Sequence, residues 1–565
     1  MSHLSIKLMS LLLMVPLCTA QVNKGQLAQA SGKLSIGYLN SNMSLIEGAE
    51  TDVESVYLSG LLSDPLVAAD ETSALKCVLV EEKYQDLGGS KYQFKIKSGV
   101  KWVNGKPITG KDVEASFFVW RNQQVQRRSY NKMSTYISSV KASDSDPTSF
   151  TVSFYHPVDN PLRYLSLPVF SSSVIESGKF AENYMQRIMP CNGPFVIDGM
   201  WNRSSSEINL KRNTNYVVPW PDEYEELENY KTYLTINGIK LVQFSSSNEL
   251  YDALASQDVR FYFYYPYSIN VDNRVLTARD LVVGNITGVV INVDAKGGGH
   301  ELLSQNGTIP KVDETHKDLR KALDLLIDRT DILKQKLRMN LSEEMIDMEY
   351  TLYGPMRKSD YLASKLPPKP SPNISQAEAL FIKSGLKKQG GKWFYNGKPF
   401  ELSFLRKPRL DESMRLISDY VIKQLTDFGI TVNQPIVQNE DYYKKLRAGD
   451  FNLAFYSAML PFEDYWVSAQ QFFKSGNLYN YSKYRNARVD QLFDQADNSK
   501  NVSDAKNKSQ DACKAIEDDH PWIFLFNMPY RVVYTKNFVH NMSDKLNGDD
   551  LFQEIHTWQT GYKGK

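Results

Sequence analysis

The side chains that most often carry catalysis or metal binding are few and widely spaced in this sequence. Its seven histidines stand at positions 3, 156, 300, 316, 520, 540 and 556, so no two have the i, i+4 spacing of a helical zinc site. The sequence contains no H-E-x-x-H motif, no G-x-S-x-G nucleophile elbow and no phosphate-binding P-loop. We therefore expect that the protein is not an enzyme and that it binds no metal or cofactor.

Two segments have a suggestive composition but lack the spacing that the chemistry needs. Gly297–His300 (GGGH) has neither the lysine nor the strand–helix flanks of a phosphate loop, which favours a surface loop. Asp222–Glu226 (DEYEE) lacks the spaced oxygen ligands and the glycine of a calcium loop. We interpret these carboxylates as a solvated face.

Composition excludes further classes of protein. Of 565 residues, 42% are hydrophobic and 12% aromatic, which is too apolar for a mostly disordered chain. Lys and Arg together number 66 against 65 Asp and Glu, a formal charge of +1. A nucleic-acid-binding protein would show a basic excess, and a polybasic membrane-surface protein would too.

The N-terminus has the parts of a secretory signal peptide. Lys7 precedes an apolar stretch, Leu8–Leu17, and the small residues Cys18-Thr19-Ala20 follow. The apolar stretch is about half of the roughly 20 residues that span a bilayer. We expect residues 1–20 to be removed after Ala20 and the protein to be periplasmic. The alternative is a lipid anchor on Cys18, although Leu17 is larger than the residue such processing prefers.

Export would place the three remaining cysteines, Cys77, Cys191 and Cys513, in an oxidising compartment. Their spacing matches no zinc or redox motif, and three thiols cannot all pair. The sequence leaves open whether two of them form a disulfide or all three stay free.

Strand and helix patterns alternate along the chain and indicate an α/β fold with mixed sheets. Residues 92–97 alternate with period two, and Thr109 with Asp112 predicts a capped helix start. A helical spacing relates Leu319, Ala322, Leu323, Leu326 and Ile327, and a second relates Ile417, Val421 and Leu425. Gly429 is expected to end the second helix, and Gly449 precedes a buried strand up to Tyr456.

Seven segments, in order, resemble the extracellular solute-binding proteins of family 5, the oligopeptide, dipeptide and nickel receptors of ABC importers. They are Tyr92–Phe117, Cys191–Phe195, Leu210–Tyr216, Asp318–Arg329, Leu425–Val432, Gly449–Leu453 and Asn480–Phe493. Together they span about residues 33–530, whereas Leu61–Val80 fits the family pattern poorly. Asp464–Ser468 and His556–Trp558 resemble the microcin-C-type peptide receptor branch.

The resemblance implies a two-lobed periplasmic binding protein of class II with a third domain and a hinge between the lobes. It assigns 21–60, 160–285 and 525–565 to lobe I, 61–159 to the additional domain and 286–524 to lobe II. The chain would cross between the lobes near Thr287–Val293 and near His520–Phe526. The aromatic run Phe261–Tyr267 is expected to be one strand with a core face and a cleft or surface face; the alternative is that its rings stack on a ligand.

The resemblance also suggests how a ligand would be held. Oligopeptide receptors pair the ligand's amino group with an aspartate, and that position is Pro461 here, while an arginine position is Phe455. Because a buried unpaired charge is costly, Glu463 and Asp464 are the nearest replacements. The alternative is that both are solvated loop carboxylates. The full set of candidate ligand-binding residues is Glu463, Asp464, Tyr465, Trp466, Tyr456, Tyr38 and Asn40.

The function implied is capture of peptides or peptide-like solutes and delivery to an ABC transporter permease, by a monomer that binds no nucleic acid. Alternatives on the same scaffold are receptors for a nickel chelate, haem, an oligosaccharide or an opine. A nickel or haem receptor would place His or Met in the cleft. An exported chaperone or a surface adhesin is a further alternative.

Overall fold

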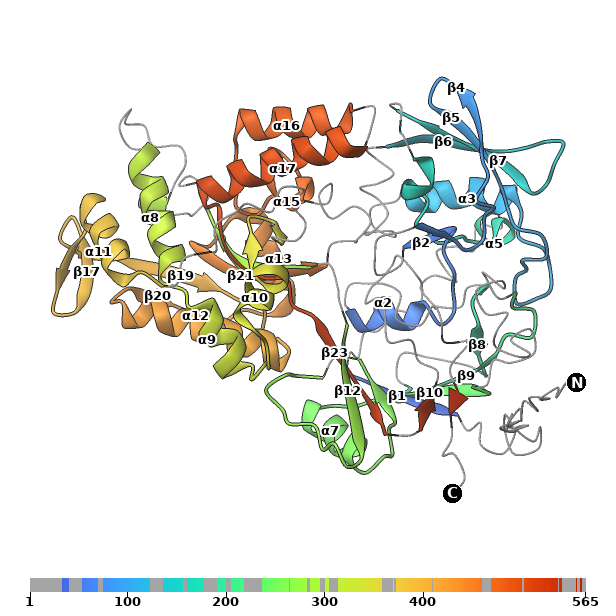
Figure 1. Ribbon diagram of the computed structural model, residues 1–565, viewed down its shortest axis with the longest axis horizontal. Coiled ribbons are helices and arrows are strands. Elements are labelled where there is room, and N and C mark those ends of the chain that lie inside the picture. Colours follow the sequence, from blue (N-terminus) through green and yellow to red (C-terminus); the bar gives the residue numbers. More distant parts are fainter. Residues whose placement is uncertain are drawn as a thin grey trace, which may run out of the picture.

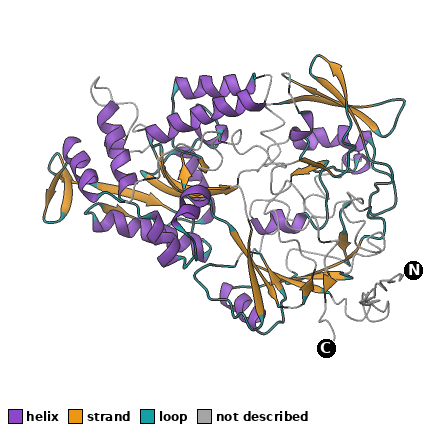
Figure 2. Ribbon diagram, viewed as in Figure 1, coloured by secondary structure: helices purple, strands orange, loops and turns teal. Residues whose placement is uncertain are grey.

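The computed structural model describes residues 33–39, 53–69, 75–121, 136–155, 158, 160–176, 191–199, 205–217, 236–263, 265–281, 285–294, 300–303, 313–357, 369, 372–408, 410–459, 469–499, 502–536, 538–540, 555 and 559–560. They form three bodies, each with its own sheet, which we call the first lobe, the third unit and the second lobe (Figure 1). Helices and strands occur in all three bodies, so the α/β prediction is confirmed (Figure 2).

The first lobe is built on a seven-stranded sheet in the order β12-β23-β11-β1-β10-β9-β8. Strand β1 runs parallel to both neighbours, β10 and β11, and the other pairs are antiparallel. Helix α2 supplies Leu58 to the core on one face, and α7 supplies Leu250 and Leu254 to the core on the other. The elements are β1 (Leu34–Tyr38), α2 (Val53–Ser59), β8 (Phe195–Ile197), β9 (Glu207–Arg212), β10 (Gly238–Gln243), α7 (Ser247–Ala255), β11 (Phe261–Tyr262), β12 (Leu276–Leu281) and β23 (Tyr530–Thr535).

The aromatic run Phe261–Tyr267 differs from its prediction. Only Phe261 and Tyr262 belong to a strand, β11, and every described side chain of the run is buried. Phe261 and Phe263 lie in one core and Tyr262 and Tyr265 in the other, because β11 is an interior strand between β1 and β23. An interior strand with both faces covered has no solvent or cleft face.

The third unit contains a four-stranded sheet in the order β4-β5-β7-β6 with α3 packed on it. Strand β5 buries Tyr92 and Phe94, as the period-two pattern predicts. Helix α3 begins where predicted, with the Asp112 carboxylate accepting a hydrogen bond from the Thr109 N–H at 2.8 Å. The elements are β2 (Val67–Ala69), β3 (Leu75–Cys77), β4 (Gln85–Gly88), β5 (Lys91–Lys95), α3 (Gly110–Trp120), β6 (Ile137–Ala142), β7 (Ser149–Phe154), η1 (Pro161–Tyr164) and α5 (Ser172–Glu176).

The second lobe surrounds a five-stranded sheet in the order β20-β19-β21-β13-β22. Strand β13 is buried along its whole length because β21 and β22 pair with its two edges. The sheet comprises β13 (Asn285–Ile291), β19 (Glu401–Leu405), β20 (Thr431–Asn433), β21 (Leu453–Met459) and β22 (Trp522–Phe526). The helices are α8 (Asp313–Leu325), α9 (Arg329–Asp331), α10 (Glu343–Met345), α11 (Ile374–Lys383), α12 (Glu412–Asp427), α13 (Asn439–Ala448), α15 (Gln470–Phe473), α16 (Ala487–Asp497) and α17 (Val502–Asp519).

The two predicted helices of this lobe are confirmed as α8 and α12. Gly429, with φ +105°, lies just past the end of α12, and Gly449 ends α13 in the left-handed conformation. The remaining elements are η5 (Glu301–Leu303), η6 (Ile332–Lys336), η7 (Ile346–Tyr350), β14 (Leu352–Tyr353), β15 (Met356–Arg357), β16 (Lys387–Gln389), β17 (Lys392–Tyr395), β18 (Lys398–Pro399), β24 (Val539–His540) and β25 (Gln559–Thr560).

The chain passes between the two large sheets twice. It leaves β12 at Leu281 and enters β13 at Asn285, and it returns between Phe526 and Tyr530. The sequence predicted these crossings at Thr287–Val293 and His520–Phe526, but those residues belong mostly to β13 and β22. The first crossing therefore comes a few residues earlier in the chain than predicted, and the second a few residues later. Among the described residues, no disulfide joins Cys77, Cys191 and Cys513, which answers the question that the sequence left open.

Candidate functional site

Three strand ends of the second lobe meet at the edge of its sheet from which both crossings leave. Strand β13 begins there at Asn285, opposite Met459 at the end of β21, and Phe526 ends β22 on the other side. Figure 1 shows β23 running from this edge down into the first lobe. The part of the space between the lobes that borders the crossings is therefore close to these three strand ends.

A buried asparagine joins the two crossings. The Asn285 side chain accepts a hydrogen bond from the Met528 N–H at 2.9 Å and donates another to the Met528 carbonyl. The Asn285 N–H donates to Oδ1 of Asn527 at 2.8 Å. Both asparagines are almost fully buried, so each polar atom in this clamp needs its partner.

The predicted acidic segment starts from the same edge. Glu463, Asp464, Tyr465 and Trp466 lie outside the described residues, so their placement stays a prediction. The segment that carries them connects Met459, at the edge, to α15, where Ala469 is fully buried. Met459 therefore starts the segment beside the crossings.

Tyr456 is the one member of the candidate set on β21. Its ring is partly exposed and lies 5.2 Å from Tyr481, 5.9 Å from Trp522 and 6.2 Å from Phe472, measured between ring centroids. Burial raises the pKa of the Tyr456 hydroxyl well above its usual value, and this hydroxyl is hydrogen-bonded to Tyr481. An aromatic ring with a protonated hydroxyl suits contact with a peptide.

Phe455, the neighbour of Tyr456, has its side chain in the core of the second lobe with 1% exposed. Its carbonyl accepts a hydrogen bond from the Tyr442 hydroxyl at 2.7 Å. The position where the resembled receptors carry an arginine is thus a packing position here, without a cation for a ligand carboxylate.

On the first lobe, Tyr38 is the last residue of β1. Ligands of α/β proteins usually bind near the carboxyl ends of parallel strands. The Tyr38 ring is 3% exposed and packs within the core, while Asn40 lies outside the described residues. Sequence reasoning missed Glu54 on α2. Its buried carboxyl group accepts hydrogen bonds from the Leu39 N–H at 2.9 and 3.0 Å, which places an acidic side chain beside the end of β1. The sequence signal that could have identified Glu54 was the presence of an acidic residue inside the apolar pattern of residues 53–58.

A small cavity of about 20 Å³ lies between the lobes beside the second crossing. Its walls are Tyr265 and Tyr267 of the first lobe, Asp411, Ser413 and Met414 at the start of α12, and Met528–Arg531. The Arg531 guanidinium lies 4.1 Å from the centre of the Tyr267 ring. This volume holds about one water molecule, so the lobes are in close contact here.

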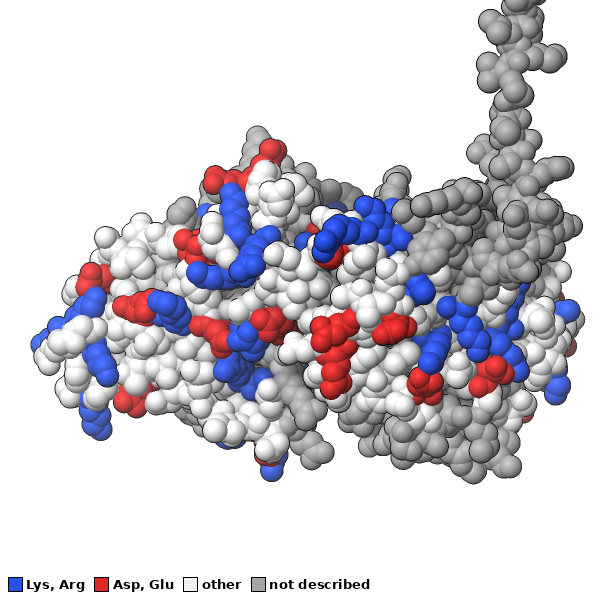
Figure 3. Space-filling model, turned by 90° about the horizontal axis from the view of Figure 1, so that it is seen from below, with Lys and Arg blue, Asp and Glu red and all other residues white. Residues whose placement is uncertain are grey.

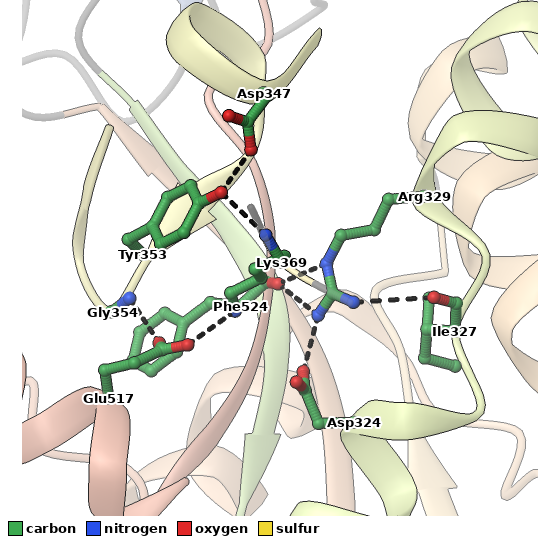
Figure 4. Close-up of polar contacts among 9 residues, drawn as sticks. All are labelled: Asp324, Ile327, Arg329, Asp347, Tyr353, Gly354, Lys369, Glu517 and Phe524. Carbon is green, nitrogen blue, oxygen red and sulfur yellow. Dashed lines mark hydrogen bonds and ion pairs between the residues drawn. The ribbon is translucent and has the colours of Figure 1, made fainter. Parts of the chain in front are cut away.

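A larger cavity of about 460 Å³ lies within the second lobe, between α9, η6, η7 and Lys369. Figure 4 shows polar contacts among charged groups that line or adjoin it, including Arg329, Lys369 and Asp324. Arg329 pairs with Asp324 at 2.5 Å and donates to the Phe524 carbonyl, and Lys369 pairs with Glu517 at 2.9 Å.

Burial alone would raise the pKa of Asp324, but Arg329, Lys369 and His520 hold it below its usual value. The charges behind the larger cavity therefore satisfy one another. The cavity is lined by both acidic and basic side chains and favours no single charge in a ligand.

Within the described ranges, no group of three or more His, Cys, Asp or Glu side chains could hold a metal ion. The helices of those ranges are too short or too polar to cross a lipid bilayer. Figure 3 shows acidic and basic side chains interspersed over the described part of one face.

Comparison with known proteins adds independent observations. Residues 74–480 match the family described as "Bacterial extracellular solute-binding proteins, family 5 Middle". The oligopeptide-binding protein AppA of Bacillus subtilis (strain 168) is 22% identical over 557 residues, covering 92% of this chain and 93% of AppA.

Solved structures of similar proteins share the fold. AppA from Bacillus subtilis in complex with a nonapeptide has a TM-score of 0.72 at 19% identity, covering 94% of this chain and 99% of that chain. NikZ from Campylobacter jejuni in complex with Ni(L-His) has a TM-score of 0.72 at 16% identity, with the same coverage. DppA from Helicobacter pylori in complex with the peptide STSA has a TM-score of 0.70 at 16% identity, again with the same coverage. The fold is thus that of the two-lobed periplasmic binding proteins.

Proposed function

Because the chain belongs to family 5 of the bacterial extracellular solute-binding proteins, we propose that it captures peptides or peptide-like solutes between its lobes for an ABC importer. Proteins of this family are the solute-binding components of such importers. The observation that carries the peptide assignment is the likeness, along nearly the whole chain, to AppA, whose structure holds a nonapeptide.

The architecture of the described residues supports this function. Two sheets connected by two short crossings can close around a solute, and the Asn285 clamp keeps the crossings in register while the lobes move. An extended peptide can bind through hydrogen bonds to its backbone, so the receptor can bind it without selecting particular peptide side chains.

In this proposal Glu463 and Asp464 balance a positive group of the ligand, with Tyr465, Trp466 and Tyr456 packing around it. Glu54 places one more carboxylate near the opposite lobe's strand end. These acidic side chains fit a ligand that carries an amino terminus or a basic residue. The buried Phe455 and Tyr38 would contribute through packing.

We also propose that the protein is exported by its first 20 residues, acts as a monomer without enzymatic activity and docks on a permease in the inner membrane. The domain division given above is kept as part of this proposal. The cluster of buried side chains in the third unit reaches Phe170, which favours extending that domain from 159 to about 170.

A nickel chelate is the second candidate, because NikZ, with Ni(L-His) bound, has the same TM-score as AppA. Native mass spectrometry of the protein purified without unfolding tests both candidates, and elemental analysis of the same sample measures nickel. A population of bound masses between about 300 and 1,500 Da that fragment as peptides is expected, in the range of roughly three to a dozen residues. Stoichiometric nickel with histidine would instead establish the chelate.

A further inference from the structure

A hydrogen bond joins the third unit to the second lobe on the side of the molecule away from the crossings. The Tyr136 hydroxyl donates to Oδ1 of Asp497 at 3.1 Å, although the two residues are 361 positions apart in sequence. Tyr136 directly precedes β6, and Asp497 is the last residue of α16. Figure 1 shows these elements next to each other at the top of the molecule, whereas β23 crosses at the bottom.

Tyr136 is held firmly by the third unit. Its side chain is largely buried, and its ring lies 4.6 Å from that of Tyr164, between centroids. The Tyr136 carbonyl accepts a hydrogen bond from the Tyr155 N–H at 2.9 Å. The hydroxyl therefore moves with the sheet of the third unit as a body.

Asp497 is held with equal firmness by the second lobe. Its Oδ1 also accepts a hydrogen bond from Nε2 of Gln470 at 2.8 Å, and the Lys474 ammonium lies 3.7 Å from Oδ2. Its side chain is only 12% exposed, so the carboxylate has lost most of its water. Burial raises its pKa, and the Gln470, Lys474 and Tyr136 donors oppose that rise. Separation from Tyr136 would remove one of the hydrogen-bond donors that replace the water lost from the Asp497 carboxylate on burial.

The Tyr136–Asp497 contact lies far from the crossings that form the hinge. Rotation of one lobe about the crossings moves Asn285 and Met528 little, but it separates groups on the opposite side by the largest distance. A hydroxyl–carboxylate hydrogen bond weakens quickly once its donor–acceptor distance passes about 3 Å, so an opening of the lobes that carries Tyr136 away from Asp497 would break this bond.

We propose that the Tyr136–Asp497 pair is a latch that stabilises the closed conformation and slows release of the solute. The proposal rests on the solute-binding function proposed above. It gives the third unit a part in closure through contact with the second lobe, separate from any contact with the solute.

The test compares Tyr136→Phe with the parent protein, because this change removes the hydroxyl and keeps the ring packed on Tyr164. Tyr92→Phe is the matched control: its hydroxyl donates at 2.8 Å to the Val158 carbonyl within the third unit. Small-angle scattering measures the radius of gyration. Dilution of a complex with mixed-sequence nonapeptides, followed by tryptophan fluorescence, measures the rate of release.

We expect Tyr136→Phe to increase the radius of gyration or to release peptide about five- to tenfold faster, the effect of one lost hydrogen bond. Tyr92→Phe should change neither quantity. Asp497→Asn should act in the same direction, and the double variant should show less than the combined effects of the single variants. Scattering and release both equal to those of the parent, or fully additive effects, would overturn the latch.

The two proposals fail in different ways. If the parent protein binds none of the nonapeptides, the assignment of peptides of that length is wrong, and the scattering comparison alone decides whether the pair stabilises closure. If peptides bind but Tyr136→Phe leaves shape and release unchanged, the latch is wrong and the peptide assignment stands.

Discussion

Asn527 and Asn285, which are 242 residues apart, are joined by a hydrogen bond from the Asn285 N–H to Oδ1 of Asn527. Each residue belongs to one of the two crossings, so the bond holds the hinge strands side by side. The Asn285 side chain completes the clamp with two hydrogen bonds to the Met528 backbone. Motion between the lobes thus starts from a hinge in which these groups of Asn285, Asn527 and Met528 are already hydrogen-bonded.

Asn285→Ala should lower the stability of the protein. It leaves the buried Met528 N–H and carbonyl without these partners, and each unsatisfied group costs about 1–3 kcal/mol. We expect a loss of about 2–4 kcal/mol in the free energy of unfolding, measured by urea denaturation. Asn433→Ala is the control, because Asn433 is exposed and its bond to Glu401 is at the surface. Equal midpoints for the two variants would show that the clamp contributes nothing.

Glu463→Gln and Asp464→Asn test the acidic segment. If either carboxylate pairs with a buried positive group of the ligand, its neutral variant should lose about 2–5 kcal/mol of binding, roughly 30-fold to several thousand-fold in affinity. Solvated carboxylates predict changes within about 0.5 kcal/mol. Calorimetric titration with the co-purified solute measures the difference. Asp450→Asn serves as control, because Asp450 is exposed at the opposite end of β21. Binding within threefold of the parent for both variants would rule the pairing out.

Asp64 should make stability depend on pH. Burial is the main cause that raises its pKa to about 7, while Tyr216 and Lys97 partly oppose the rise. The folded state therefore holds the proton more tightly than the unfolded chain, whose carboxyl has a pKa near 3.9. The resulting stability is complete below pH ~4 and is lost as the pH rises through about 7.

Asp64→Asn removes this dependence. The two proteins should be nearly equal in stability at pH 4, and by pH 8 the variant should be more stable than the parent by about 2–4 kcal/mol, since the carboxyl pKa differs by about three units between the folded and unfolded states. Urea denaturation at both pH values measures the difference, with Asp198→Asn as an exposed control. A parent advantage at pH 8 would show that the Asp64 carboxylate is stabilised when charged.

The leader should be removed on export. N-terminal sequencing of periplasmic protein should begin at Gln21, because Cys18-Thr19-Ala20 fits a signal peptidase site. Cys18→Ser should be exported and processed like the parent. Recovery of the parent in the membrane fraction, with release only in Cys18→Ser, would establish the lipid anchor.

Sequence by itself determined features whose partners lie within a few residues of one another. Thr109 and Asp112 cap α3 through a contact three positions apart, and Gly429 ends α12 because glycine adopts positive φ without strain. The same holds for the buried faces of α8 and α12. Ordered short motifs also sufficed to identify the family, since each depends on local spacing.

Only the tertiary structure decided the features that depend on which strands become neighbours. Phe261 and Tyr262 are buried on both faces of the sheet because β11 lies between β1 and β23, a pairing of segments more than 200 residues apart. Asn285 with Asn527, and Tyr136 with Asp497, likewise acquire their partners through the arrangement of whole sheets. Side-chain periodicity specifies which face of an element is buried, but it contains no information about which distant element covers that face.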